Sequence, residues 1–245
     1  MEALLKYLEF MPAYAIDLVT LLGSPKAFLK NRNIGTGEDW SKALNFFALS
    51  SVIAFLIQSS GMSLDVKFFI SLLRAIVFWA IGTLFLAAAI KISWRMVGGR
   101  ASFNSILLTH LYGFSGFLLI SACYSLIFAG LIAIFYPGYY SEILRMAEKG
   151  LANMFSQIIS NPDAVSSILE KYPTLRRFEM VSNTILDFVM LSWIIVIWGA
   201  YRELNKASRA RSFAAFILCG FISVPTFGIL LLLTAGGSLT TAPQP

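Results

Sequence analysis

The chain has 245 residues, of which 58% are hydrophobic and only 13% are charged, and its mean hydropathy is +0.75. Soluble domains carry about 25% charged residues, so this composition excludes a water-soluble globular protein and indicates an integral membrane protein. The net charge of +6 does not indicate nucleic acid, because membrane proteins gather Lys and Arg in their cytoplasmic loops. The lipid bilayer is therefore an expected partner, and nucleic acid is not.

Residues 1–42 precede the first long apolar stretch and are expected to form a cytoplasmic, interfacial segment. Four apolar residues share one side of its first helix: Leu4, Leu5, Leu8 and Met11. Pro12 is expected to interrupt this helix. Gly23 is then expected to cap a helix end, and a second short helix is expected to start at Pro25 with Ser24 as its N-cap. A helix that binds a partner protein is the alternative interpretation of the segment.

Five stretches are long and apolar enough to cross the hydrocarbon layer, which needs about 20 helical residues. They are residues 43–60, 68–91, 104–136, 181–201 and 212–235. The third stretch would be about 50 Å long as one helix, so it must tilt, protrude or bend. In the fifth stretch, Pro225 is expected to kink the helix. The fold class predicted is all-α: a polytopic membrane protein with five transmembrane helices and amphipathic interfacial helices.

The basic residues of the connections predict the orientation, because cytoplasmic loops are enriched in Lys and Arg. The connections at 92–103 and 202–211 are basic, whereas the tail at 236–245 carries no charge. We therefore expect the N-terminus and both connections to be cytoplasmic and the C-terminus to be outside. The expected cytoplasmic basic contacts are Arg95, Arg100, Arg202, Lys206, Arg209 and Arg211.

The longest connection, residues 137–180, is expected to form an extracytoplasmic helical cap. Its five basic residues argue mildly against an outside location, but a folded segment of this length crosses largely regardless of its charge. Residues 143–159 space their apolar side chains along one helix face. The predicted organisation is an N-terminal segment at 1–42, transmembrane helices at 43–136, the cap at 137–180, transmembrane helices at 181–235 and a tail at 236–245.

Two charged side chains, Arg74 and Asp187, lie inside predicted spans, where a charge costs at least ~2.5–3.5 kcal/mol. Both are expected roughly 9 Å below the outer surface, at 1.5 Å per residue, so they can form one intramembrane ion pair. Ser71 and Asn183 lie a helical turn away and give polar support, as does His110. The functional interpretation is a proton or ion relay, and the structural one is a clamp between helices. We favour the clamp, because a transporter usually has more polar residues at the midplane.

The sequence contains no recognised catalytic or cofactor-binding motif. His110 is the only histidine, and Cys123 and Cys219 lie far apart in apolar stretches, so no set of metal ligands is expected. We expect His110 to pack or to form a hydrogen bond near the inner end of the third span. No enzymatic activity, cofactor or metal is therefore expected.

Three stretches resemble a known family: GSPKAFL at 23–29, GGRASFNSILLTHLYGF at 98–114 and WGAYRELNKASRARSFAAFIL at 198–218. Together they resemble the Yip1-domain membrane proteins in their bacterial and archaeal branch, which typically have five spans joined by short basic cytoplasmic connections. The resemblance covers residues 20–235, although the 137–180 connection is longer than is usual in the family. The DLYGP motif of the eukaryotic relatives is absent, and HLYGF at 110–114 only echoes it, so Rab binding is not carried over.

The resemblance implies a non-enzymatic membrane protein that acts as a scaffold, as an accessory subunit of a membrane complex, or in membrane organisation and trafficking. The partners it implies are other membrane proteins, such as an ABC-type exporter, or further copies of the chain, in a prokaryotic inner or plasma membrane. The alternative is a small-solute or ion transporter or channel, with Arg74 and Asp187 lining its path.

Overall fold

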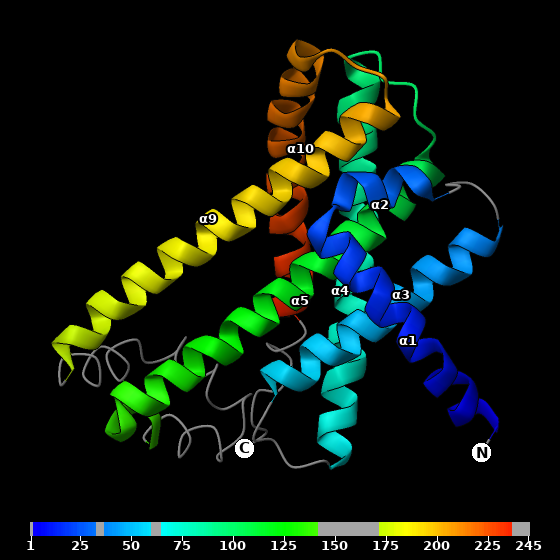
Figure 1. The fold of residues 1–245 in the computed structure, drawn as a ribbon. Helices are drawn as coiled ribbons and strands as arrows, with labels where there is room; N and C mark the ends of the chain where they lie inside the picture. Colours follow the sequence, from blue (N-terminus) through cyan, green and yellow to red (C-terminus); the bar gives the residue numbers. More distant parts are fainter. Residues whose placement is uncertain (1, 33–36, 60–64, 142–171, 237–245) are drawn as a thin grey trace, which may run out of the picture. The chain divides into compact units, whose positions relative to one another are not determined.

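The computed structural model describes residues 2–32, 37–59, 65–141 and 172–236, without the side chains of 2–10, 37–38, 67, 173 and 226–236. Within these ranges the chain is helical and forms no strand, which confirms the predicted all-α class (Figure 1). The helices are α1 (Glu2–Gly23), α2 (Pro25–Asn31), α3 (Gly37–Gln58), α4 (Val66–Met96), α5 (Phe103–Phe135), α9 (Pro173–Leu204) and α10 (Arg209–Gly236).

Four of these helices are long and apolar enough to cross a membrane, and the chain is an integral membrane protein. They are α3, α4, α5 and α9, and α1 adds a shorter apolar stretch at Met11–Gly23. The fifth predicted span falls on α10, which has 28 residues and continues past Pro225. Because the side chains beyond Pro225 are not described, the crossing of α10 remains a prediction.

Several helices extend beyond the predicted spans at their polar ends. Helix α9 begins at Pro173, well before residue 181, because the fixed φ angle and missing N–H of proline suit the first turn of a helix. Helix α5 continues through Gly113 and Gly116 without interruption, so neither glycine breaks the long third span. The cap helix predicted at 143–159 lies outside the described residues.

The prediction that Pro12 interrupts the first helix was wrong. Helix α1 runs unbroken from Glu2 to Gly23 with Pro12 inside it. A proline removes one backbone hydrogen bond, but Tyr14, two residues after it, is buried and packs against Phe46 of α3 with 4.9 Å between the ring centroids. This tertiary contact holds the helix together across the missing bond. Gly23 ends the helix as predicted.

The chain divides into two compact units, which share the four long apolar helices. Unit 1 contains residues 1–49, 74–116 and 194–245, and unit 2 contains residues 50–73 and 117–193. Helices α1, α2 and α10 belong entirely to unit 1. Each unit has its own set of contacts between helices.

Unit 2 is held together by aromatic side chains where the end of α5 meets the start of α9. Phe128 of α5 stacks on Phe178 of α9 with 5.6 Å between the centroids, and the Tyr124 hydroxyl bonds to Ser182. Tyr139, just beyond α5, is buried and donates a hydrogen bond of 3.2 Å to Glu179. These contacts fix the antiparallel pairing of α5 and α9 in this unit.

In unit 1 the N-terminal helices pack against α3 and α5 through a row of aromatic rings that contact one another. Tyr112 of α5 lies at the centre, with its ring centroid 5.3 Å from that of Phe46 on α3 and 5.1 Å from that of Phe28 on α2. Phe28 and Leu29 are buried, so α2 contributes its apolar side to the core of the unit. Ser24 and Pro25 occupy the predicted N-cap and first helical positions, although the Ser24 side chain makes no capping bond.

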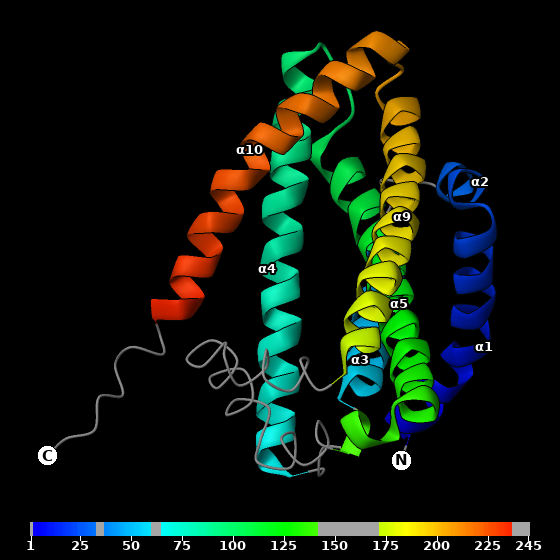
Figure 2. The same cartoon turned by 90° about the vertical axis from the view of Figure 1, so that its left-hand side faces the viewer.

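The connections of two helix hairpins, α4–α5 and α9–α10, lie side by side in unit 1 (Figure 2). In both hairpins the first helix ends with a residue in the left-handed conformation. After α4, Gly98 takes a φ of +84°, and Gly99 N–H reaches back to Trp94 C=O over 2.7 Å. After α9, Lys206 takes the same left-handed position with a φ of +48°, and Ala207 N–H reaches back to Arg202 C=O over 3.2 Å. Both ends are Schellman motifs, in which glycine is the usual left-handed residue.

Replacing Lys206 by Gly should therefore stabilise the protein by about 1 kcal/mol, because only a residue without Cβ occupies the left-handed region without strain. Thermal unfolding in detergent measures the change. Lys206→Ala removes the same charge but keeps a Cβ, so it should not stabilise. Equal gains in both variants would show that the charge, not the backbone, limits stability at this position.

The second prediction concerns alkaline pH and unit 2. Burial raises the pKa of Tyr139 to about 12, with smaller contributions from the Glu179 carboxylate and its hydrogen bond. The stabilisation that Tyr139 provides is therefore complete below pH ~10, the value for an unfolded tyrosine, and is lost as the pH rises towards 12. The stability advantage of wild type over Tyr139→Phe should shrink over that window in unfolding followed by circular dichroism. An advantage that stays constant to pH 12 would contradict this, and Tyr140→Phe is the matched control.

Candidate functional site

The α4–α5 and α9–α10 connections are joined by one side chain, Asn205. Its Oδ1 accepts a hydrogen bond of 3.1 Å from the backbone N–H of Ala101, and its Nδ2 donates one of 2.9 Å to Tyr201 C=O. Asn205 is only 4% exposed. The N–H of Ala101 lies outside a helix and needs a partner, so this amide holds the two connections in a fixed arrangement. It also places them at the same membrane surface.

The approach of the two connections requires a glycine at position 99. A Cβ there would lie 2.5 Å from Asn205 Oδ1 and 2.8 Å from Trp94 C=O. The second contact is with backbone and cannot relax by a rotation of a side chain. The Gly98-Gly99 pair therefore supplies the turn at its first residue and the close contact at its second.

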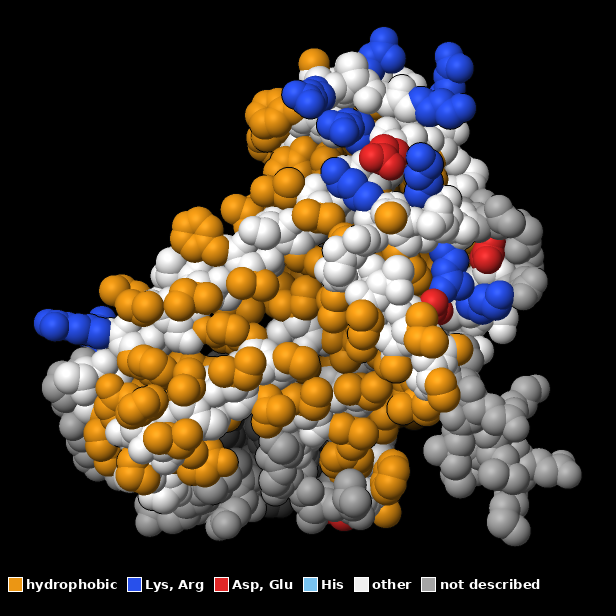
Figure 3. All heavy atoms as spheres, viewed as in Figure 1, with side chains coloured by type: hydrophobic (Ala, Val, Ile, Leu, Met, Phe, Trp, Pro, Cys, Tyr) orange, Lys and Arg blue, Asp and Glu red, His pale blue; other side chains and the backbone are white. Residues whose placement is uncertain are grey.

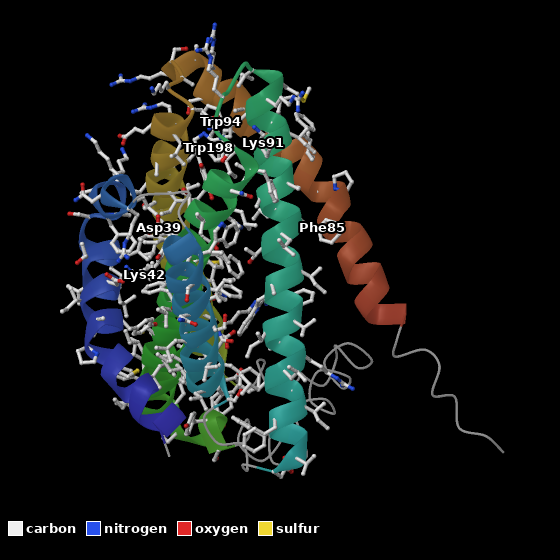
Figure 4. The ribbon with its side chains drawn as sticks, turned by 90° about the vertical axis from the view of Figure 1, so that its right-hand side faces the viewer. Asp39, Lys42, Phe85, Lys91, Trp94 and Trp198 are labelled. Atoms are coloured by element: carbon white, nitrogen blue, oxygen red, sulfur yellow. The ribbon has the colours of Figure 1, made fainter. Side chains whose placement is uncertain are left out.

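We call the place where Asn205 joins the α4–α5 and α9–α10 connections the junction. Aromatic side chains of α4 and α9 pack beneath it (Figure 4). Trp94 of α4 is fully buried and stacks on Trp198 of α9 with 5.5 Å between the ring centroids. Trp198 Nε1–H donates a hydrogen bond of 3.1 Å to Ser212 C=O in α10. Lys91 of α4 donates to Ala101 C=O. Both backbone groups of Ala101 are thus bound by side chains, one from α4 and one from the α9–α10 connection.

His110 lies between α5 and α9 in unit 1, below the junction. Its Nδ1 is 2.9 Å from the Tyr201 hydroxyl, and both residues are buried. Near this pair, Gly113 allows α5 to approach α9 so closely that a Cβ would lie 2.9 Å from Ile197 Cγ2. His110 therefore takes part in the packing of these two helices.

The N-terminal stretch GSPKAFL reaches the same region. Lys26 of α2 packs across Gly199 of α9, where a Cβ would lie 2.5 Å from Lys26 Cε. Arg32, just after α2, forms an ion pair with Asp17 of α1 and places its guanidinium 4.7 Å from the centre of the Phe28 ring. The stretches at 23–29, 98–114 and 198–218 thus meet in unit 1.

The basic residues predicted as contacts surround the junction. Arg202 is half-buried, and the other five are exposed: Arg95, Arg100, Lys206, Arg209 and Arg211. The Arg211 guanidinium lies 3.9 Å from the position of a Cβ on Gly98, so the first turn of α10 extends over the α4–α5 connection. One surface therefore carries cations from both connections.

The predicted intramembrane pair joins residues of different units. Arg74 lies in unit 1 and Asp187 in unit 2, and both side chains are exposed. Ser71 is half-buried and Asn183 is exposed. The ion pair and its polar support remain a prediction.

The residues that build the junction were missed by the sequence reasoning, which took only the cations of these connections as contacts. Asn205, Lys91, Trp94 and Trp198 contribute through contacts over 10 to 104 positions of sequence. The one available signal is an asparagine at the end of a long apolar stretch, where its amide can reach a neighbouring backbone.

No known protein family matches the chain, and neither does any curated protein or any solved structure.

Removing the Asn205 amide should destabilise the protein by about 2 kcal/mol, because it leaves the buried Ala101 N–H without an acceptor. Asn205→Ala should lower the midpoint of thermal unfolding in detergent by several degrees. Asn104→Ala, which truncates an exposed asparagine next to the same connection, should change it little. Equal effects of the two substitutions would show that Asn205 does not bind the connections together.

Proposed function

We propose that the protein is a non-enzymatic scaffold or accessory subunit of a membrane complex. The observation that supports this proposal is that polar side chains of unit 1 form hydrogen bonds between helices and connections. Asn205, His110 and Lys91 bond to neighbouring helices or connections, so these three polar side chains serve to fix the bundle. A rigid bundle that keeps its cations outward is suited to presenting contact surfaces to other membrane proteins.

The family resemblance supports the same proposal. The stretches at 23–29, 98–114 and 198–218 contact one another through Lys26 and Gly199 and through Asn205 and Ala101. Residues that carry a family pattern and share one contact network are expected to serve a common structural role. On this proposal the protein is Yip1-like and prokaryotic, its N-terminus and both connections are cytoplasmic, and its C-terminus is outside. Its partners are other membrane proteins, such as an ABC-type exporter, or further copies.

A transporter or channel is the second candidate, and two charges within the apolar helices favour it. Arg74 lies in the apolar stretch of α4 and Asp187 in that of α9. Ionisable residues inside spans often mark a path for ions or protons. The two candidates differ in what the loss of these charges would change.

The scaffold proposal is tested by solubilising native membranes in mild detergent, capturing the tagged chain and identifying the bound proteins by mass spectrometry. The same membrane protein should be recovered at a fixed ratio in repeated preparations. Arg32→Gln, which breaks the ion pair with Asp17, is the control that shows whether loosened packing of the N-terminal helices alone reduces the recovery. Recovery of the chain alone, as a monomer in detergent and in nanodiscs, would contradict the proposal.

The clamp and the transport path are separated by Arg74→Gln and Asp187→Asn, singly and combined. If the pair is a clamp, each single variant should unfold several degrees below wild type, because an unpaired charge is left in hydrocarbon, and the double variant should recover most of the loss. Arg202→Gln, at the end of the same α9, is the control. If all variants fold normally while ion or solute flux in liposomes disappears, the transporter replaces the scaffold.

A further inference from the structure

The surface around the junction of unit 1 is strongly and unevenly charged. Six cationic side chains belong to it, as described above, whereas residues 91–103 and 202–211 contain a single acidic residue, Glu203. Figure 3 shows Lys and Arg side chains gathered over the connections, next to apolar surface. Such a concentration of one sign attracts an anionic partner.

The cations of this surface are held in a fixed arrangement. The Asn205 bond to Ala101 joins the two connections, and Arg211 reaches over Gly98. Ser208 Oγ accepts a bond of 3.4 Å from the Arg211 N–H at the start of α10. The backbones that carry the guanidinium groups are therefore positioned before any ligand arrives, which lowers the entropic cost of binding.

Large apolar side chains are interleaved with the cations and point outward. Phe213 is 68% exposed and Met96 is 63% exposed, and they stand two residues and one residue from Arg211 and Arg95. A surface for a soluble acidic protein does not need such a border, whereas side chains at the boundary between lipid tails and headgroups combine both types. The apolar border therefore favours a lipid as the occupant.

We propose that this surface binds the phosphate groups of anionic lipids at the membrane surface where both connections lie. Guanidinium groups bind phosphate oxygens through paired, charge-assisted hydrogen bonds, and Phe213 and Met96 contact the upper acyl chains. Clusters of four to eight basic residues beside a transmembrane helix are typical of such lipid recognition. The proposal concerns the bilayer itself and does not rest on the scaffold role.

The test compares thermal unfolding in nanodiscs of phosphatidylcholine alone and of phosphatidylcholine mixed with phosphatidylglycerol. Wild type should unfold several degrees higher in the mixed nanodiscs, since a ligand of the folded state stabilises it. Arg209→Gln/Arg211→Gln should lose more than half of this gain, and native mass spectrometry should show fewer retained phosphatidylglycerol molecules. Arg95→Gln/Arg100→Gln should give the same result from the other connection, should the first pair fail to fold.

The matched control is Arg176→Gln/Arg177→Gln, which removes two exposed arginines from the opposite end of α9. It should keep the wild-type gain. An equal loss in this control would show a response to total charge and would overturn the proposal, as would a full gain in both junction variants. A gain of the same size from soluble polyglutamate added to phosphatidylcholine nanodiscs would also overturn it, because the surface would then bind any polyanion.

Discussion

The backbone N–H of Ala101 has to be satisfied in a chain with very little polar surface, and the side chain that satisfies it comes from 104 positions later in the sequence. This single bond to Asn205 constrains much of unit 1. It requires Gly99, because any larger residue would occupy the space of the amide, and it holds the ends of α4 and α9 together. The His110–Tyr201 contact and the close approach at Gly113 then follow along α5 and α9.

Much of the helical organisation was predictable because it follows from composition and local backbone chemistry. Long apolar stretches must form helices in lipid, where every backbone group needs a partner, and the structure has helices at all five predicted spans. The Gly98-Gly99 turn has a similarly local cause, since glycine occupies the left-handed region without strain. The end of α9 carries no such signal, because Lys206 takes the same conformation there.

What the sequence did not reveal depends on contacts between distant residues. Nothing in the surrounding sequence distinguishes Asn205 from other asparagines. It becomes important only because α9 ends beside the α4–α5 connection. Pro12 predicts a helix break, yet the packing of Tyr14 on Phe46 keeps α1 continuous. The basic charge of the connections predicted the cations of the junction. Neither charge nor hydrophobic periodicity shows which helix lies beside which, so the amide and indoles that position these cations were not predicted.

The two ends of α5, a helix of 33 residues, meet different side chains. At 1.5 Å per residue its 33 residues measure about 50 Å, which exceeds the roughly 30 Å of hydrocarbon even at the usual tilt of about 20°. At that tilt both ends extend past the hydrocarbon into the polar layers. One end meets tyrosines, such as Tyr136 and Tyr139, and the other meets arginines, such as Arg100. Tyrosine and arginine are both typical of membrane interfaces, and the arginine end is the one where cations from two hydrogen-bonded connections gather.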